Sequence, residues 1–246
     1  MKHITGKAAL LTLSMISASA FASHWGYEGN SSPEHWGELD EAYKTCQNGL
    51  NQSPINIDST IQAHLSPLQT HYIDGPVTLT NNGHTIQANE PANTRDTLTL
   101  DKQTWTLQQF HFHAPSENTV HGKKYAMEMH LVHKNASGEL TVVAVMFDKG
   151  AANPELEKLW SVMPQLAEQN VSIKDNLNLN TLLPKDKTYW RFSGSLTTPP
   201  CSEGVIWIVL KHPMTVSAQQ LDKFTHTMHH DNNRPIQSLH GRVVVE

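Results

Sequence analysis

The sequence has 246 residues, of which 38% are hydrophobic and 17% are charged, a composition typical of soluble globular proteins. Its formal net charge is −5 and its isoelectric point lies near 6.3, with no run of basic residues. This charge balance gives no reason to expect a nucleic-acid partner. We find no repeats, low-complexity stretches or interdomain linkers, so a single domain is the simplest prediction.

The first 22 residues have the features of a secretory signal peptide. Lys2 and Lys7 precede an apolar stretch that runs over residues 8–20. The Ala-Phe-Ala at 20–22 fits a small-x-small cleavage site. The alternative is a membrane anchor. The stretch is shorter than the roughly 20 residues of a spanning helix, and it contains four hydroxyl side chains. We therefore predict cleavage after residue 22 and export.

The chain has two cysteines, Cys46 and Cys201. An even number of cysteines in an exported chain favours a disulfide bond. Two buried free thiols remain an alternative. A metal-binding pair is less favoured because the two residues do not form a short C-x-x-C motif.

Residues 24–57 carry aromatic and turn-forming side chains, and we expect Trp25 and Trp36 to pack this irregular segment onto the core. Short runs typical of β-strands follow between residues 65 and 107. The Asn-Asn-Gly at 81–83 is a turn signal, so His84 on pattern alone is a residue leaving a turn.

The segment from Leu107 to Lys134 predicts a hairpin with unusual chemistry. Residues two apart share one face of a strand, so polar and apolar side chains separate cleanly on both predicted strands. The apolar faces carry Phe110 and Phe112 on the first strand, and Met127, Met129 and Leu131 on the second. The opposite faces carry Gln109, His111 and His113 on the first strand, and Glu128, His130 and Val132 on the second.

If the two strands pair, three imidazoles converge on one point. Three histidines with room for a fourth ligand are typical of a catalytic zinc site rather than a structural one. Ligating imidazoles need a partner on the other ring nitrogen, and Gln109 and Glu128, each two residues before a histidine, are candidates. The alternative is chance, because the chain contains 16 histidines.

Two strands, two helices and a rigid turn are predicted after the hairpin. The near-continuous apolar run at 139–150 is typical of a buried strand. Asn153-Pro154 and the capping box at Ser217 each predict the start of a helix that packs on the core, the first ended or kinked by Pro164. The five residues 196–200 form a rigid turn before a strand at 205–210.

Seven blocks of this sequence resemble the α-class carbonic anhydrases in their bacterial, exported form. They occur in the family order and span nearly the whole chain after the first two dozen residues. The blocks are WGY at 25–27, QSPINI at 52–57, NNGH at 81–84, QFHFHAPSEN at 109–118, EMHLVH at 128–133, GSLTTPPCSEGVIWIV at 194–209 and NNRP at 232–235.

The resemblance implies a mainly β, α/β catalytic domain over residues 23–246, built on a large, twisted, mostly antiparallel sheet with short peripheral helices. It implies a periplasmic zinc enzyme whose small-molecule substrate is carbon dioxide. The expected reaction is reversible hydration to bicarbonate and a proton, by attack of zinc-bound hydroxide and proton transfer through a histidine. Oligomeric state does not follow from the sequence.

The resemblance also implies roles for individual residues. His111, His113 and His130 match the zinc ligands, and His84 matches the proton shuttle. Thr197 matches a threonine that accepts a hydrogen bond from the hydroxide and donates its own to a glutamate, here Glu117. The matching solvent network is Tyr27, Asn82 and Gln87, where Gln87 replaces the Asn usual in animal members. The matching substrate pocket is Val132, Val143, Leu196, Thr198 and Trp207, and the matching disulfide is Cys46–Cys201.

Other classes of protein remain as alternatives. A zinc hydrolase for esters or peptides would use the same ligands, although the chain has no HExxH motif. An inactive binding module is expected to have lost a zinc-binding histidine, whereas all three are present. A structural or storage protein gives no reason for this arrangement of histidine, glutamine, glutamate and threonine.

Overall fold

A computed structural model describes residues 24–246. The predicted signal peptide, residues 1–22, lies outside the described residues. Within the described part, no helix is both long and apolar enough to cross a membrane.

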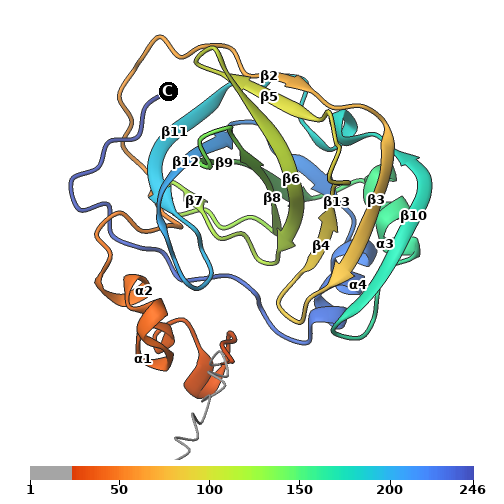
Figure 1. Cartoon of the computed structure of the whole chain (residues 1–246), viewed down its shortest axis with the longest axis horizontal. Coiled ribbons are helices and arrows are strands. Elements are labelled where there is room, and N and C mark those ends of the chain that lie inside the picture. Colours follow the sequence, from red (N-terminus) through yellow and green to blue (C-terminus); the bar gives the residue numbers. More distant parts are fainter. Residues whose placement is uncertain (1–23) are drawn as a thin grey trace, which may run out of the picture.

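A large sheet of eleven strands dominates the structure (Figure 1). Its main path runs β10-β3-β4-β6-β8-β9-β12-β11. Off this path, β5 pairs with β6, β2 pairs with β5, and β13 pairs with β9. Neighbouring strands are antiparallel except where β9 meets β12 and β13. The predicted fold class, a mostly antiparallel sheet with short helices, is therefore confirmed.

The strands alternate along the chain with turns and irregular segments. In the large sheet they are β2 (Gln69–His71), β3 (Gly75–Asn81), β4 (Ile86–Asn89), β5 (Thr97–Leu100), β6 (Gln103–His113), β8 (Met127–Lys134), β9 (Leu140–Lys149), β10 (Gln169–Leu177), β11 (Tyr189–Ser195), β12 (Glu203–Leu210) and β13 (Met214–Val216). Two short strands, β1 (Asn56–Ile57) and β7 (Thr119–Val120), pair separately.

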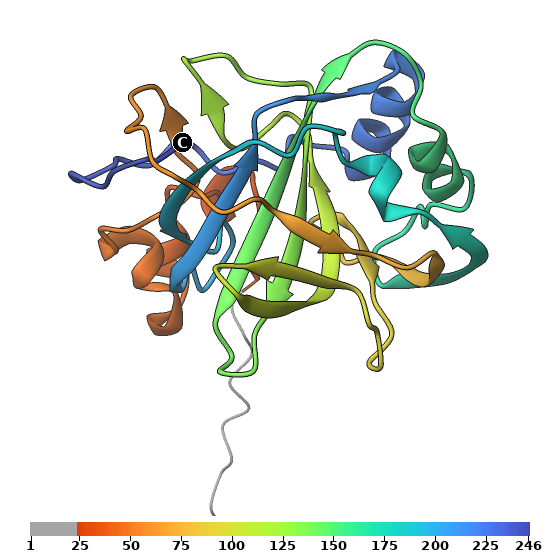
Figure 2. The same ribbon diagram turned by 90° about the horizontal axis from the view of Figure 1, so that it is seen from above.

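The short helices lie in two groups on opposite sides of the molecule (Figures 1 and 2). The group at the N-terminus contains α1 (Trp36–Leu39) and α2 (Thr45–Asn48), and the other contains α3 (Pro154–Ser161) and α4 (Ala218–Met228). Three single turns of 3-10 helix, η1 (Gly29–Ser31), η2 (Glu41–Tyr43) and η3 (Leu179–Leu182), complete the list.

Helices α3 and α4 begin where the caps predicted. The Asn153 side chain accepts hydrogen bonds from the main-chain N–H groups of the first turn of α3. Ser217 and Gln220 form the capping box of α4. Gln220 also exchanges two hydrogen bonds with the main chain of Asn153, so the two caps tie the helices together.

The central strands are buried on both faces, which explains the continuous apolar run in β9. One face packs Phe110, Phe112 and Met129 against Trp160 and Phe224 from α3 and α4. The other face forms a separate apolar cluster, which consists of Ile55, Ile57, Val120, Tyr125, Val142, Ala144, Met146, Phe192, Val205, Trp207, Val209 and Val244. This second face surrounds the predicted metal site.

Several elements were not predicted, among them β10, β11, α1 and α2. Strand β10 is an edge strand that pairs with β3 alone, and its sequence QNVSIKDNL is too polar to signal a strand. Helices α1 and α2 are four residues each, shorter than any periodicity can indicate. As predicted, Trp36 is fully buried, where it packs against the two cysteines.

Candidate metal centre

The β6–β8 hairpin brings the three histidines together. In the antiparallel register, His111 faces His130, Gln109 faces Val132, and His113 faces Glu128. One nitrogen from each of the three imidazoles lies within 4.8 Å of the others. The period-two expectation for both strands is therefore met, and the apolar partners Phe110 and Phe112 face Leu131 and Met129 on the other side.

Each imidazole is oriented by an acceptor on its outer nitrogen. Nδ1 of His111 donates to Oε1 of Gln109 at 2.8 Å, and Nδ1 of His113 donates to the carbonyl of Asn232 at 2.6 Å. Nε2 of His130 donates to Oε1 of Glu128 at 2.8 Å. Since these nitrogens carry the protons, the lone pairs are on Nε2 of His111 and His113 and on Nδ1 of His130.

Burial keeps the three rings neutral. Removal from water lowers the pKa of all three histidines, and the neighbouring imidazoles add to this for His111 and His130. Burial also raises the pKa of Glu128, against the hydrogen bonds that its carboxylate accepts from Asn118 and from the main chain of Glu117. Neutral imidazoles are the form that binds a metal ion.

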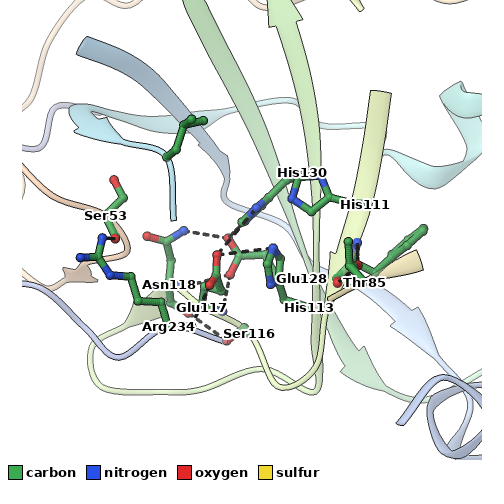
Figure 3. Close-up of polar contacts among 12 residues, drawn as sticks. Ser53, Thr85, His111, His113, Ser116, Glu117, Asn118, Glu128, His130 and Arg234 are labelled. Atoms are coloured by element: carbon green, nitrogen blue, oxygen red, sulfur yellow. Dashed lines mark hydrogen bonds and ion pairs between the residues drawn. The ribbon is translucent and has the colours of Figure 1, made fainter. Parts of the chain in front are cut away.

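The donor set fits a tetrahedral cation such as zinc. Nε2 of His113 is buried and has no hydrogen-bond partner among the described residues, an arrangement that costs free energy unless a ligand satisfies it. Three neutral nitrogens suit zinc better than calcium or magnesium, which prefer oxygen. The cluster, with its carboxylate neighbours, is drawn in Figure 3.

Glu117 lies next to His113 and His130 (Figure 3). Its Oε2 is 3.5 Å from Nε2 of His113 and 3.8 Å from Nδ1 of His130. Burial raises the pKa of the Glu117 carboxyl to about 8, while the main-chain N–H of Arg234 and the hydroxyl of Thr197 act to lower it. A cation among the histidines would lower it further.

The predicted hydrogen bond from Thr197 to Glu117 is incomplete in the structure. Thr197 is buried, and its hydroxyl is near enough to Glu117 to lower the pKa of that carboxyl. Oε2 of Glu117 nevertheless has no hydrogen-bond partner of regular geometry in the described chain. Oε1 of Glu117, by contrast, is firmly held by the main-chain N–H of Arg234 at 2.8 Å.

The histidines form the floor of a cavity of about 210 Å³. One wall is apolar and includes Val132, Leu196 and Trp207. The other wall is polar and includes Asn82, His84 and Gln87. The remaining lining residues are Trp25, Tyr27, Thr85, Gln109, His111, His113, His130, Val142, Thr197 and Thr198.

The prediction of Val143 in the apolar wall is wrong. Val142 pairs with Val132 and lines the cavity, whereas Val143 pairs with Leu131 and is buried in the core on the opposite face. Because successive side chains of β9 point to opposite faces, an error of one residue moves the side chain from the site into the core.

His84 lies at the cavity wall but in an unexpected environment. Its ring stacks on Trp25, with ring centroids 3.7 Å apart and an interplanar angle of 9°. Burial, with His24 and His230 nearby, lowers the pKa of His84 to about 4. Trp25, which we expected only to pack on the core, is therefore also a cavity residue.

The three predicted solvent-network residues all line the cavity. The Asn82 side chain accepts hydrogen bonds from the main-chain N–H groups of His84 and Thr85, which sets the turn that carries His84. The Gln87 amide donates to Asn89 at 2.5 Å. The Tyr27 hydroxyl is buried with no hydrogen-bond partner in the described part of the chain.

The structure joins Cys46 to Cys201 in a disulfide bond, with the two Cα atoms 5.0 Å apart. The bridge connects α2 to the turn that carries Thr197 and Thr198. The predicted pairing is therefore formed, and residues 155 apart in sequence are held together beside the site.

Besides Val142 and Trp25, two residues that orient groups of the site were not predicted as site residues. The Asn232 carbonyl orients His113, and its amide group binds the main chain at Phe112 and His84. Arg234 holds Glu117 through its main-chain N–H. The NNRP block contains both residues, but no sequence pattern indicates that main-chain groups of this block hydrogen-bond to His113 and Glu117.

Together, a mostly antiparallel sheet, three converging neutral imidazoles and a half-apolar cavity form a candidate metal centre of the three-histidine kind that catalytic zinc sites use. Residues 31–246 match the family model described as eukaryotic-type carbonic anhydrase. The chain belongs to the carbonic anhydrase family, and it is an enzyme of the α class.

Relatives of known sequence and structure are similar over most of the chain. The carbonic anhydrase of Klebsiella pneumoniae is 70% identical over 246 residues, covering 100% of both chains. The α-carbonic anhydrase of Thermovibrio ammonificans, solved with the inhibitor sulfanilamide, is 47% identical with a TM-score of 0.88, covering 91% of this chain and 99% of that one. A structure of dioscorin complexed with ascorbate is 30% identical with a TM-score of 0.85, covering 90% and 97%.

Proposed function

We propose that this protein catalyses the zinc-dependent, reversible hydration of carbon dioxide to bicarbonate and a proton. The observation that carries the proposal is the convergence of three neutral imidazole lone pairs on the floor of a cavity with one apolar wall. His111, His113 and His130 would hold the metal, leaving a fourth position open toward the cavity.

Zinc, when bound there, would lower the pKa of a water molecule and so supply hydroxide near neutral pH, an effect for which carbonic anhydrases are the standard example. The chain's contribution to metal binding is orientation. Gln109, Glu128 and the carbonyl of Asn232 each fix one ring, which reduces the rearrangement that metal binding requires.

The pair Thr197 and Glu117 would orient the attacking oxygen. A hydroxyl both donates and accepts, so a Thr197 hydroxyl that donates to ionised Glu117 has only acceptor positions left for the nucleophile. The nucleophile must then donate its proton to Thr197, which directs its lone pair toward the substrate.

Carbon dioxide is small and uncharged, and an apolar surface next to the nucleophile suits it. Val132, Val142, Leu196 and Trp207 provide this surface. Trp207 is itself fixed, because its indole N–H donates to the Ser195 carbonyl at 3.0 Å and its ring stacks on Phe192. We place Thr198 at the same end of the cavity as Thr197, beside the bound substrate.

We propose that His84 carries the product proton to solvent through water molecules near Tyr27, Asn82 and Gln87. A ring with a pKa of about 4 is a poor proton acceptor at neutral pH. The proton-accepting form of His84 is therefore one whose ring has left Trp25 and faces water, where the ordinary histidine pKa near 6.5 suits the task.

We also propose that the protein acts in the periplasm after removal of residues 1–22. The Cys46–Cys201 disulfide supports this placement, since disulfides persist in oxidising compartments.

The proposal is tested by stopped-flow carbon dioxide hydration with purified mature protein. The zinc-loaded protein is expected to hydrate carbon dioxide rapidly, the metal-free protein to be inactive, and sulfanilamide to inhibit. A zinc-loaded, folded protein without hydration activity would refute the proposal, and would leave a binding protein as the better description.

A further inference from the structure

Arg234 is a buried arginine close to the site, but it does not line the cavity. Its side chain is 1% exposed and lies over the ring of Trp36. Burial lowers the pKa of the guanidinium only to about 10, so it is charged at neutral pH. A buried charge requires partners, and those of Arg234 identify what it holds.

The guanidinium binds the cystine and the segment that follows α2. Its Nη2 donates to the carbonyl of Cys46 at 2.7 Å. Its Nη1 donates to the carbonyl of Ser53 and to Oε1 of Gln52, each at 2.8 Å. The Gln52 amide in turn donates to the carbonyl of Cys201 at 3.0 Å. Arg234 thus reaches one cystine carbonyl directly and the other through Gln52.

Cys201 belongs to the turn that carries Thr197. Two main-chain hydrogen bonds close this turn, from Leu196 N–H to Ser202 at 3.0 Å and from Cys201 N–H to Thr198 at 2.9 Å. A displacement of Cys201 is therefore transmitted to Thr197.

The main chain of Arg234 binds Glu117, the proposed hydrogen-bond partner of Thr197. Its N–H donates to Oε1 of Glu117, which leaves Oε2 facing the site (Figure 3). Glu117 and Thr197 come from segments 80 residues apart, and each is tied to Arg234 by a separate path. Among the described residues, only Arg234 is hydrogen-bonded both to Glu117, through its main chain, and to Gln52, through its side chain.

We propose that Arg234 is a positioning residue that aligns the Thr197 hydroxyl with the Glu117 carboxylate. This inference rests on the proposed hydration function and deepens it. The planar guanidinium fork is what the role needs, because it holds three oxygen acceptors in fixed directions. A lysine keeps the charge but loses that geometry.

The test compares Arg234→Lys with Arg242→Lys. Arg242 is a matched control because its guanidinium also donates to main-chain carbonyls, those of Gln52, Ser193, Ser238 and Leu239, but to neither cystine carbonyl. We expect Arg234→Lys to bind one zinc per chain and to lose about 10-fold in kcat/KM for carbon dioxide, because misplacement of orienting groups slows attack. Arg242→Lys should stay within about 2-fold of the unsubstituted protein.

A double-mutant cycle with Thr197→Ala separates positioning from general damage. If Arg234 acts through Thr197, Arg234→Lys should cost little, less than about 2-fold, once the hydroxyl is gone. A purely structural role predicts the same fold-loss in both backgrounds. That result, or unchanged kcat/KM in Arg234→Lys, would overturn the inference.

Hydrogen exchange gives a readout that is independent of activity. Arg234→Lys should speed amide exchange in residues 196–202 and leave the β6–β8 hairpin unchanged, whereas general destabilisation would speed both. If Arg234→Lys does not fold, Gln52→Ala takes its place. It removes the amide that links Arg234 to Cys201, together with the hydrogen bond from that amide to Glu203, and leaves Arg234 itself in place. The same cycle then applies.

Failure of the inference and failure of the proposed function give different results. An unsubstituted, zinc-loaded protein that does not hydrate carbon dioxide refutes the function. An active protein whose Arg234→Lys variant behaves like Arg242→Lys refutes only the positioning role.

Discussion

His130 and His133 are three residues apart on β8, and both are fully buried histidines with a lowered pKa. They differ in the face of the strand that carries them. His130 lies beside two other imidazoles on the floor of a cavity. His133 lies in the closed core, where its Nε2 meets the Tyr72 hydroxyl at 2.9 Å. Burial and a lowered pKa therefore do not identify a metal ligand. The convergence of several imidazoles and their access to a cavity do.

The largest expected effect comes from replacing each histidine in turn. His130→Ala should lose zinc and hydration activity, because two imidazoles remain where three are needed. His133→Gln, which keeps a polar partner for Tyr72, should retain both. Zinc content by mass spectrometry under native conditions and stopped-flow hydration measure the two outcomes. A His130→Ala variant with full zinc and full activity would remove the distinction between the two histidines.

The partners of the two histidines allow a second comparison. Glu128→Ala should weaken zinc affinity by roughly 10–100-fold, a range for which carbonic anhydrases are among the reference cases. Tyr72→Phe removes the corresponding partner of His133 and should leave zinc affinity unchanged. Competition with a chelator measures both affinities. Equal affinities in the two variants would mean that Glu128 does not support the metal.

His84 differs from His130 and His133, because it is partly exposed and its ring stacks on Trp25 rather than on any of the three candidate metal ligands. His84→Ala should lower kcat by about 10-fold in weak buffer and leave kcat/KM nearly intact, since attack on carbon dioxide does not use the proton carrier. Imidazole buffer should restore the loss. Trp25→Ala should raise the pKa of His84 from about 4 toward 6.5, measured by NMR titration. An unchanged kcat in weak buffer would show that His84 is not the carrier.

The smallest effect is on stability. The pKa of His133 is about 4 in the folded protein, against 6.5 when exposed, so the unfolded state binds the proton first as pH falls. His133 thus contributes stability that is complete above pH 6.5 and is lost as pH falls toward 4.

We expect the free energy of unfolding of metal-free His133→Gln to fall less steeply as the pH is lowered over this range. The number of protons taken up on unfolding, which sets the slope, should be smaller by up to about one. Glu90, whose pKa is raised to about 7 by burial, acts with the opposite sign in both proteins and cancels in the comparison. Urea unfolding of both proteins between pH 4 and 7 measures the difference. Identical slopes would show that His133 titrates normally.

Sequence periodicity predicted the hairpin well because one face is polar and the other apolar. It could not predict the partner of His113, since that partner is a main-chain carbonyl at Asn232 that only the tertiary fold brings near. The family resemblance misplaced Val143 by one residue, and periodicity could not correct it, because β9 is apolar on both faces and its pattern does not show which valine faces the site. Strand β10 escaped notice because it is a polar edge strand.

The central claim is that three imidazoles hold one zinc that makes the site active. Titrating metal-free mature protein with zinc while following carbon dioxide hydration tests it most directly. The account predicts that activity rises linearly and levels off at one zinc per chain, and that His130→Ala shows no rise over the same range. Hydration by protein that is demonstrably free of metal, or activity that levels off only at two or more zinc ions per chain, would contradict it.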